Sequence, residues 1–158
     1  IYRFPADKST VKIRWKTMSR VRSVSLSQAM NSRNDWLSFI TKKQYHVFRK
    51  LSDINVMGAS DAYNFINEHP DSINFGDLAV AMNDGVASTR IYIIDYPASN
   101  HNGACTRSFA DGHAEHRKWH DERTTPPGTS KTRRRVVSSA QNKDMSFMSS
   151  MASIGKRR

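Results

Sequence analysis

One stretch of the chain decides the fold: YPASNHNGACTRSFADGHAEHRKW, which runs from Tyr96 to Trp119. Near its centre the pair Asp111-Gly112 separates two short segments, 108–110 and 113–116. Asp-Gly is the strongest short-range signal for a β-hairpin, because a type I′ turn needs positive φ at both central residues and these two residues tolerate it best. The stretch therefore predicts a loop, a strand, a two-residue turn and a second strand.

Outside this stretch, the sequence indicates one small β-rich domain. The chain has 158 residues, 37% of them hydrophobic, which is enough for one modest core. Short apolar or alternating segments recur at 11–26, 62–66, 78–82 and 91–94, and none resembles a long amphipathic helix. We predict an α+β, β-rich head with antiparallel strands and a C-terminal Asp-Gly hairpin.

The positive charge of the chain lies at its two ends. The net charge is +11, yet residues 51–119 carry 4 basic and 9 acidic side chains. Residues 1–50 carry 12 basic and 2 acidic side chains, and residues 120–158 carry 9 and 3. The part with the clearest folding signals is therefore acidic, and any nucleic-acid binding is expected from the basic flanks only.

The composition divides the chain into a head, residues 1–123, and a tail, residues 124–158. The tail begins with a Thr-Thr-Pro-Pro-Gly break, contains three consecutive arginines, and is rich in Ser and Met from residue 138 onward. It has little apolar surface to offset the entropy lost on ordering. We predict a mobile basic tail with at most transient helix.

The alternating segment 11–26 predicts two strands around a polar link at 16–20. Five basic side chains interleave with its apolar residues: Lys12, Arg14, Lys16, Arg20 and Arg22. Charged residues on a strand edge deter pairing with other chains, and this interpretation competes with a dedicated anion site. A second basic segment, 42–50, also contains aromatic residues and could stack bases, but such a pattern is equally typical of an amphipathic loop.

Residues that could support catalysis are sparse. His113, His116 and His120 lie close together, but on a strand His113 and His116 point to opposite faces. The single cysteine, Cys105, would need a nearby histidine and a positively charged pocket to act as a nucleophile. Because no phosphate-binding loop, Ser/His/Asp pattern or paired-carboxylate pattern is present, we predict no catalysis.

Four segments in this order resemble one bacterial family. They are Phe-Pro-Ala-Asp-Lys-Ser at 4–9, Asn-Glu-His-Pro-Asp-Ser-Ile-Asn at 67–74, Asp-Tyr-Pro-Ala-Ser-Asn-His-Asn-Gly-Ala at 95–104 and Ser-Phe-Ala-Asp-Gly-His-Ala-Glu at 108–115. They are similar to the prepilin-type proteins with the processing-associated "His, nine residues, Asp-Gly" domain, relatives of type IV pilins and type II secretion pseudopilins. The resemblance covers residues 1–123, and the family usually has Cys where this chain has Phe4.

The resemblance implies a pilin-like head of an envelope protein whose full form has a cleaved leader and a long apolar N-terminal helix. No run of ~20 apolar residues is present in this sequence. The implied protein is membrane-anchored, faces the periplasm or the exterior, and is a non-enzymatic structural subunit of a filament or secretion apparatus. Its partners would be related subunits and the inner membrane, both contacted through that helix. The alternative is a basic module that binds nucleic acid or an anionic surface polymer.

The resemblance also directs attention to a structural motif, which consists of His101, Asp111, Gly112 and Trp119. If the loop folds back on the hairpin, an imidazole–carboxylate hydrogen bond between His101 and Asp111 would clamp the two together. No cofactor is expected, but oxygen ligands from Asp71, Asp95 and Asp111 are a candidate calcium site, as in some pseudopilin heads. We favour the clamp, because hard cations usually need six or more oxygens.

Overall fold

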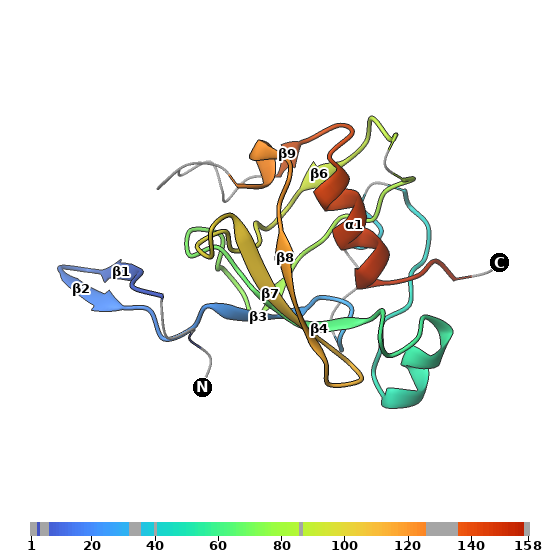
Figure 1. Ribbon diagram of the computed structural model, residues 1–158, viewed down its shortest axis with the longest axis horizontal. Coiled ribbons are helices and arrows are strands. Elements are labelled where there is room, and N and C mark those ends of the chain that lie inside the picture. Colours follow the sequence, from blue (N-terminus) through green and yellow to red (C-terminus); the bar gives the residue numbers. More distant parts are fainter. Residues whose placement is uncertain are drawn as a thin grey trace.

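A five-stranded sheet forms the centre of the protein in the computed structural model, which describes residues 3, 7–31, 36–39, 41–85, 87–125 and 136–156. Its strand order is β5-β3-β4-β7-β8, and only the β3–β5 pair is parallel. The strands are β3 (Val24–Ser27), β4 (Tyr63–Asn67), β5 (Asp77–Leu78), β7 (Ala104–Phe109) and β8 (Ala114–Lys118). The prediction of a β-rich α+β fold with antiparallel strands is therefore confirmed (Figure 1).

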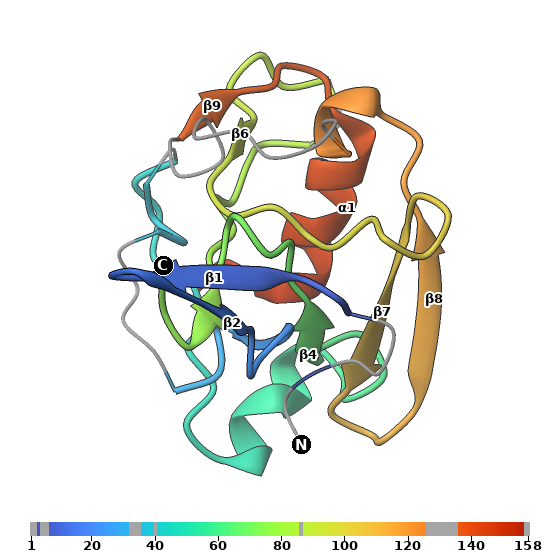
Figure 2. The same cartoon turned by 90° about the vertical axis from the view of Figure 1, so that its left-hand side faces the viewer.

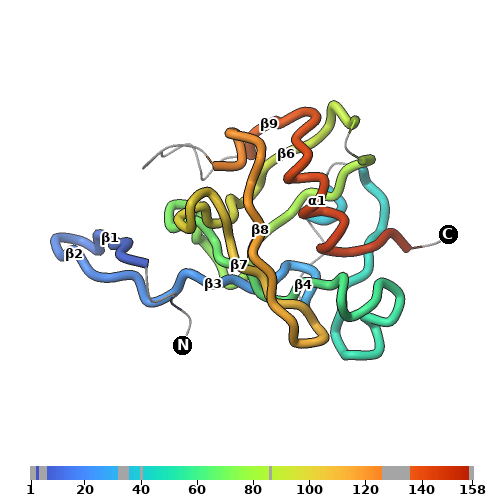
Figure 3. Tube along the Cα trace, in the orientation of Figure 1, coloured from blue at the N-terminus to red at the C-terminus, as the bar shows by residue number. Residues whose placement is uncertain are grey.

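The remaining elements lie around this sheet. Two further antiparallel pairs are β1 (Thr10–Ile13) with β2 (Lys16–Ser19), and β6 (Tyr92–Ile93) with β9 (Val137–Ser138). Three short helical elements complete the described chain: η1 (Leu51–Val56), η2 (Glu122–Thr124) and α1 (Lys143–Ala152). The trace shows that the β1–β2 hairpin stands apart from the body, whereas α1 lies beside β8 (Figure 3).

The helix α1 covers one face of the sheet. The Phe147 ring lies between two guanidinium groups of that face, 4.7 Å from Arg107 and 4.0 Å from Arg117. Met145 and Met148 on the helix join the same buried cluster as Phe109 of β7. This face and the helix thus enclose the core, while the opposite face remains partly open.

Over residues 136–156, the structure contradicts the prediction of a mobile tail. Asn142 caps α1 by accepting a hydrogen bond from Met145 N–H at 3.0 Å, and its side chain is fully buried. The carboxylate of Asp144 accepts the backbone N–H groups of His120 and Asp121, both at 2.8 Å. Apolar residues 145, 148 and 152 recur on one helix face, so the segment has the surface to offset its ordering. Residues 126–135 and 157–158 of the predicted tail lie outside the described residues.

The hairpin at Asp111-Gly112 is confirmed, but its turn type was predicted wrongly. Gly112 has φ of 94°, whereas Asp111 does not have positive φ. Gly112 N–H bonds to Phe109 O at 3.0 Å, and Phe109 N–H bonds to His113 O at 2.9 Å. The loop therefore has three residues, a turn followed by a left-handed glycine, which is the usual alternative to a two-residue type I′ loop.

The segment 11–26 contains three strands rather than two. The predicted polar link at 16–20 contains β2, and the chain reverses at Arg14 and Trp15, where Arg14 has φ of 53°. The alternation continues through this reversal, so the sequence pattern does not mark it. Cross-strand pairing joins Val11 to Met18 and Ile13 to Lys16.

Candidate functional site

Two of the segments that carry the family resemblance, 67–74 and 95–104, meet in the fold. Glu68 forms a bridge with Pro97, His69 N–H donates to Tyr96 O at 2.9 Å, and Ala98 N–H donates to Asn67 O at 2.8 Å. The indole N–H of Trp119 then donates to Ala98 O at 2.9 Å, and the Trp119 ring is buried. These backbone and indole contacts hold two distant loops to the end of the hairpin.

His101 and Asp111 do not form the predicted clamp. His101 precedes β7 and Asp111 follows it, so the six-residue strand separates them. The Asp111 carboxylate instead accepts from the ring nitrogen Nδ1 of His113 at 2.6 Å and from its backbone N–H at 3.1 Å. These bonds lower the pKa of Asp111. The loop before β7 does not fold back along the strand, because its own backbone bonds, such as Ala104 N–H to His101 O at 3.1 Å, keep it at that end.

The candidate calcium ligands are not brought together either. Asp95 is buried, and its carboxylate accepts the backbone N–H of Ala79 at 2.7 Å and the amide of Asn74 at 3.4 Å. Asp111 lies at the hairpin tip, and Asp71 lies in the loop after β4. Among the described residues, no group of three acidic, histidine or cysteine side chains is placed to hold a metal ion. The predicted site with Asp71, Asp95 and Asp111 is therefore wrong.

A buried acid lies beneath the joined loops. Glu68 is fully buried, and the hydroxyl of Ser25 donates to its carboxyl group. Burial, the largest cause, raises the pKa of Glu68 to about 8 and that of Asp95 to about 6. The negative charge of Asp95 raises the pKa of Glu68 further, and the charge of Asp77 raises the pKa of both groups. Glu68 is therefore largely a neutral hydrogen-bonding group at pH 7, which suits a structural position.

The cysteine and the histidines have structural surroundings. Cys105 is buried on β7, and burial raises the pKa of its thiol to about 12, so it stays protonated. His113 stacks on the Phe109 ring at 4.2 Å, and His116 lies across from Thr106, with 3.4 Å between His116 Nε2 and Thr106 Oγ1. The predicted separation of the His113 and His116 side chains is thus present, and the arrangement does not resemble a nucleophile with its base.

The basic residues singled out in the sequence do gather in one place. Lys12, Arg14 and Lys16 lie on the β1–β2 hairpin, called the arm here, which projects from the body of the molecule (Figures 1 and 2). Within the described part of the chain, none of these three side chains forms an ion pair. Trp15 at the end of the arm is 95% exposed. This pairing of charge with exposed apolar surface is the most distinctive surface feature of the described residues.

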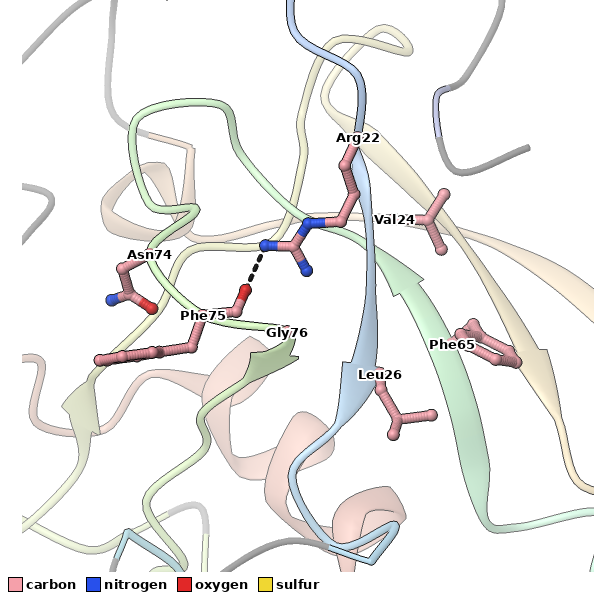
Figure 4. A pocket seen from close by; sticks show the side chains of 7 residues that line it. All are labelled: Arg22, Val24, Leu26, Phe65, Asn74, Phe75 and Gly76. Atoms are coloured by element: carbon pink, nitrogen blue, oxygen red, sulfur yellow. Dashed lines mark hydrogen bonds between the residues drawn. The ribbon is translucent and has the colours of Figure 1, made fainter.

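Two shallow cavities adjoin the base of the arm. The first, of about 230 Å³, lies between the apolar face of the arm and Val21 and Ile73 of the body. The second, of about 510 Å³, lies over the open face of the sheet between Phe65 and Phe75 (Figure 4). Arg22 lines both cavities, and its guanidinium donates to the backbone oxygen of Phe75 and to Ser25 Oγ.

The sequence pattern did not mark the aromatic residues of this surface. Phe65 is 44% exposed because a bulge in β4 turns it to the open face, and Phe75 is 74% exposed in the loop before β5. Strand alternation alone places an aromatic residue inside, so only a register irregularity could have revealed Phe65. Lys12, Arg14, Lys16, Arg20 and Arg22 were predicted as a group, and the structure keeps them on and beside the arm.

Comparison with models of protein families, with curated proteins and with solved structures finds no match for this chain. In the part of the chain that the structure describes, no helix has the length and apolar character to cross a bilayer.

Proposed function

We propose that this chain is the globular head of a pilin-like or pseudopilin-like subunit, a non-catalytic structural protein of a bacterial envelope filament or secretion apparatus. The observation that carries the proposal is the meeting of two of the resembling segments, 67–69 with 96–98, and the hydrogen bond from Trp119 to the second of them. Residues that identify the family by sequence are used to hold loops and strands together. This is the use expected of a motif that defines a fold and performs no chemistry.

The surroundings of the reactive side chains favour the same conclusion. Cys105 is a buried thiol, and Glu68 is a buried acid hydrogen-bonded to Ser25. Neither group lines one of the two cavities beside the arm. A structural subunit needs exposed surface for contacts with neighbours, and the arm and the open sheet face provide it.

The most direct test of this proposal is the coding sequence upstream of Ile1. A pilin-like subunit requires a short cleavable leader followed by ~20 apolar residues that lead into the head. We expect this pattern, and we expect the processed full-length protein in the membrane fraction of cells. An upstream sequence without an apolar segment would contradict the proposal.

The alternative, a basic module for nucleic acid or an anionic surface polymer, is supported by the uncompensated charge of the arm. Phosphate contacts make log affinity fall steeply with log salt concentration. A salt titration with a single-stranded oligonucleotide separates the two functions. Binding that persists near physiological ionic strength and shows that steep dependence would favour the alternative, whereas absence of binding there favours the structural subunit.

A further inference from the structure

The arm exposes more apolar surface than a soluble protein usually leaves uncovered. The exposed fractions are 54% for Ile13, 95% for Trp15 and 45% for Met18 on the arm, and 85% for Val21 in the body at the base of the arm. Single exposed apolar residues are ordinary, but clusters of them mark sites of interaction. These four fall within nine residues of the sequence, at the end and base of one hairpin. That hairpin projects from the body (Figure 1).

The charge of the arm restricts what can cover it. Residues 8–22 contain six basic side chains and no acidic one. Lys12, Arg14 and Lys16 are exposed, and like Arg20 they form no ion pair within the described residues. Like charges held this close repel one another, and an anionic partner would relieve that repulsion.

The mixture of side chains distinguishes between two anionic partners. Single-stranded nucleic acid binds through several aromatic platforms that stack on bases, and the arm has one aromatic residue, Trp15. Ile13 and Met18 offer nothing for a base to stack on. A membrane interface, by contrast, takes tryptophan and aliphatic side chains at the headgroup level and basic side chains beside the phosphates.

We propose that the arm docks on the surface of a membrane that contains anionic phospholipids, with Trp15 and Ile13 entering the interface and Lys12, Arg14 and Lys16 contacting headgroup phosphates. The projection of the arm allows its tip to reach the bilayer before the body does. This inference stands on the surface of the arm and does not rest on the proposed pilin-like role.

The cavity at the base of the arm fits the same partner. Its walls are apolar on both sides, with Ile13 and Met18 from the arm and Ile73 from the body. Arg20 and Arg22 stand at the same cavity. Apolar walls with adjacent guanidinium groups suit the glycerol and upper acyl region of a phospholipid whose phosphate lies on the arginines.

Co-sedimentation of the full 158-residue chain with lipid vesicles tests the proposal. We expect binding to vesicles of phosphatidylcholine mixed with phosphatidylglycerol, and none to phosphatidylcholine alone. The triple variant Lys12→Ser/Arg14→Ser/Lys16→Ser should lose about a hundredfold in affinity, since each basic side chain near an anionic surface contributes roughly fivefold. The matched control removes the same charge from other exposed positions, Arg49→Ser/Lys118→Ser/Lys156→Ser, and should bind within about threefold of the unmodified chain.

The apolar contribution is tested separately. Trp15→Ser should weaken vesicle binding by about tenfold or more, whereas Leu51→Ser, at another exposed apolar residue on η1, should not change it. Circular dichroism establishes that each variant is folded. Equal loss in the arm and control variants would overturn the proposal. So would tighter binding of a single-stranded oligonucleotide than of anionic vesicles at physiological salt, because the arm would then be a nucleic-acid surface.

Discussion

The two hairpins of this protein, β1–β2 and β7–β8, have similar strands and opposite surroundings. Both carry basic side chains among apolar or small ones, and both reverse in a short loop. In β7–β8, Phe109 is 2% exposed and Arg107 is 1% exposed, because α1 lies over that face. In β1–β2, no described segment covers Trp15, which is 95% exposed. Burial therefore depends on a distant covering segment, and the strand pattern itself does not determine it.

The covering of β7–β8 by α1 buries even a charged side chain, Arg107. The Arg107 guanidinium pairs with Glu115 across the hairpin at 2.8 Å and packs against the rings of Phe109 and Phe147. Its burial lowers the pKa of the guanidinium, which remains charged at pH 7. The arm has the same kind of side chain at Arg14, but among the described residues Arg14 forms no ion pair and no cation–π contact. An arginine is thus structural in one hairpin and available to a partner in the other.

The largest difference between the hairpins should appear on truncation of an aromatic residue in each. Phe109→Ala removes a buried ring and should lower the free energy of unfolding by about 3–5 kcal/mol. Trp15→Ala removes an exposed ring and should change it by less than about 0.5 kcal/mol. Urea denaturation of both variants measures the contrast. Comparable losses would mean that the arm packs against the body.

A second effect concerns the helix that covers β7–β8. Asp144→Ala leaves the backbone N–H groups of His120 and Asp121 without their acceptor, and should cost about 1–3 kcal/mol. The neighbouring change Lys143→Ala is the control, because that side chain is exposed, and it should be nearly neutral. Thermal unfolding compares them. A neutral Asp144→Ala would indicate that α1 is not anchored at its first turn.

The free energy of unfolding should depend on pH through two buried acids of the body. The pKa of Glu68 rises from 4.5 to about 8 in the folded protein and that of Asp95 from 3.8 to about 6. The folded state therefore binds these protons more tightly, and this stabilisation is full below about pH 4 and is lost as the pH rises through 6 and 8. We expect the unfolding free energy to fall by about 1–3 kcal/mol between pH 5 and pH 9.

Glu68→Gln separates this effect from general charge repulsion. The amide keeps the hydrogen bond with Ser25 but does not ionise, so the variant should lose most of the slope above pH 6. Thermal unfolding across the pH range measures it. An unchanged slope would assign the dependence to other groups.

The smallest predicted loss of stability comes from a substitution in the turn between β7 and β8. Gly112 has φ of 94°, so Gly112→Ala should cost about 1 kcal/mol through backbone strain. Gly76→Ala is the control, because Gly76 does not have positive φ and an added Cβ there meets no atom within 4 Å. Equal stability of the two variants would mean that the left-handed conformation of Gly112 does not contribute to the stability of the turn.

Local patterns in the sequence predicted the parts of the fold that depend on neighbouring residues. The apolar segment at 62–66 became β4, shifted by one residue, and Asp111-Gly112 became the β7–β8 loop. The same approach failed for α1, although Asn142 as a cap and the spacing of Met145 and Met148 were available as signals. The Ser-rich composition concealed a helix whose stability comes from packing on the sheet.

For the candidate site, too, the sequence predicted only what depends on residues close along the chain. The five basic residues of segment 11–26 could be grouped from sequence alone, because they are close along the chain. The pairing of 67–69 with 96–98, and the separation of His101 from Asp111 by β7, depend on topology. Sequence spacing carries no information about which strand ends meet, so the clamp and the calcium ligands were predicted wrongly, as was the polar link at 16–20 that contains β2.

The most direct test is amide hydrogen exchange of the full chain, measured with and without vesicles that contain phosphatidylglycerol. It compares the body, whose strands are covered, with the arm, which is open to a partner. We expect slow exchange for β7 and for α1 in both conditions, because their amides are covered. We expect fast exchange for residues 10–19 when vesicles are absent and slowed exchange when they are present. Exchange in 143–152 as fast as in an unfolded peptide, or an arm that vesicles leave unchanged, would contradict this expectation.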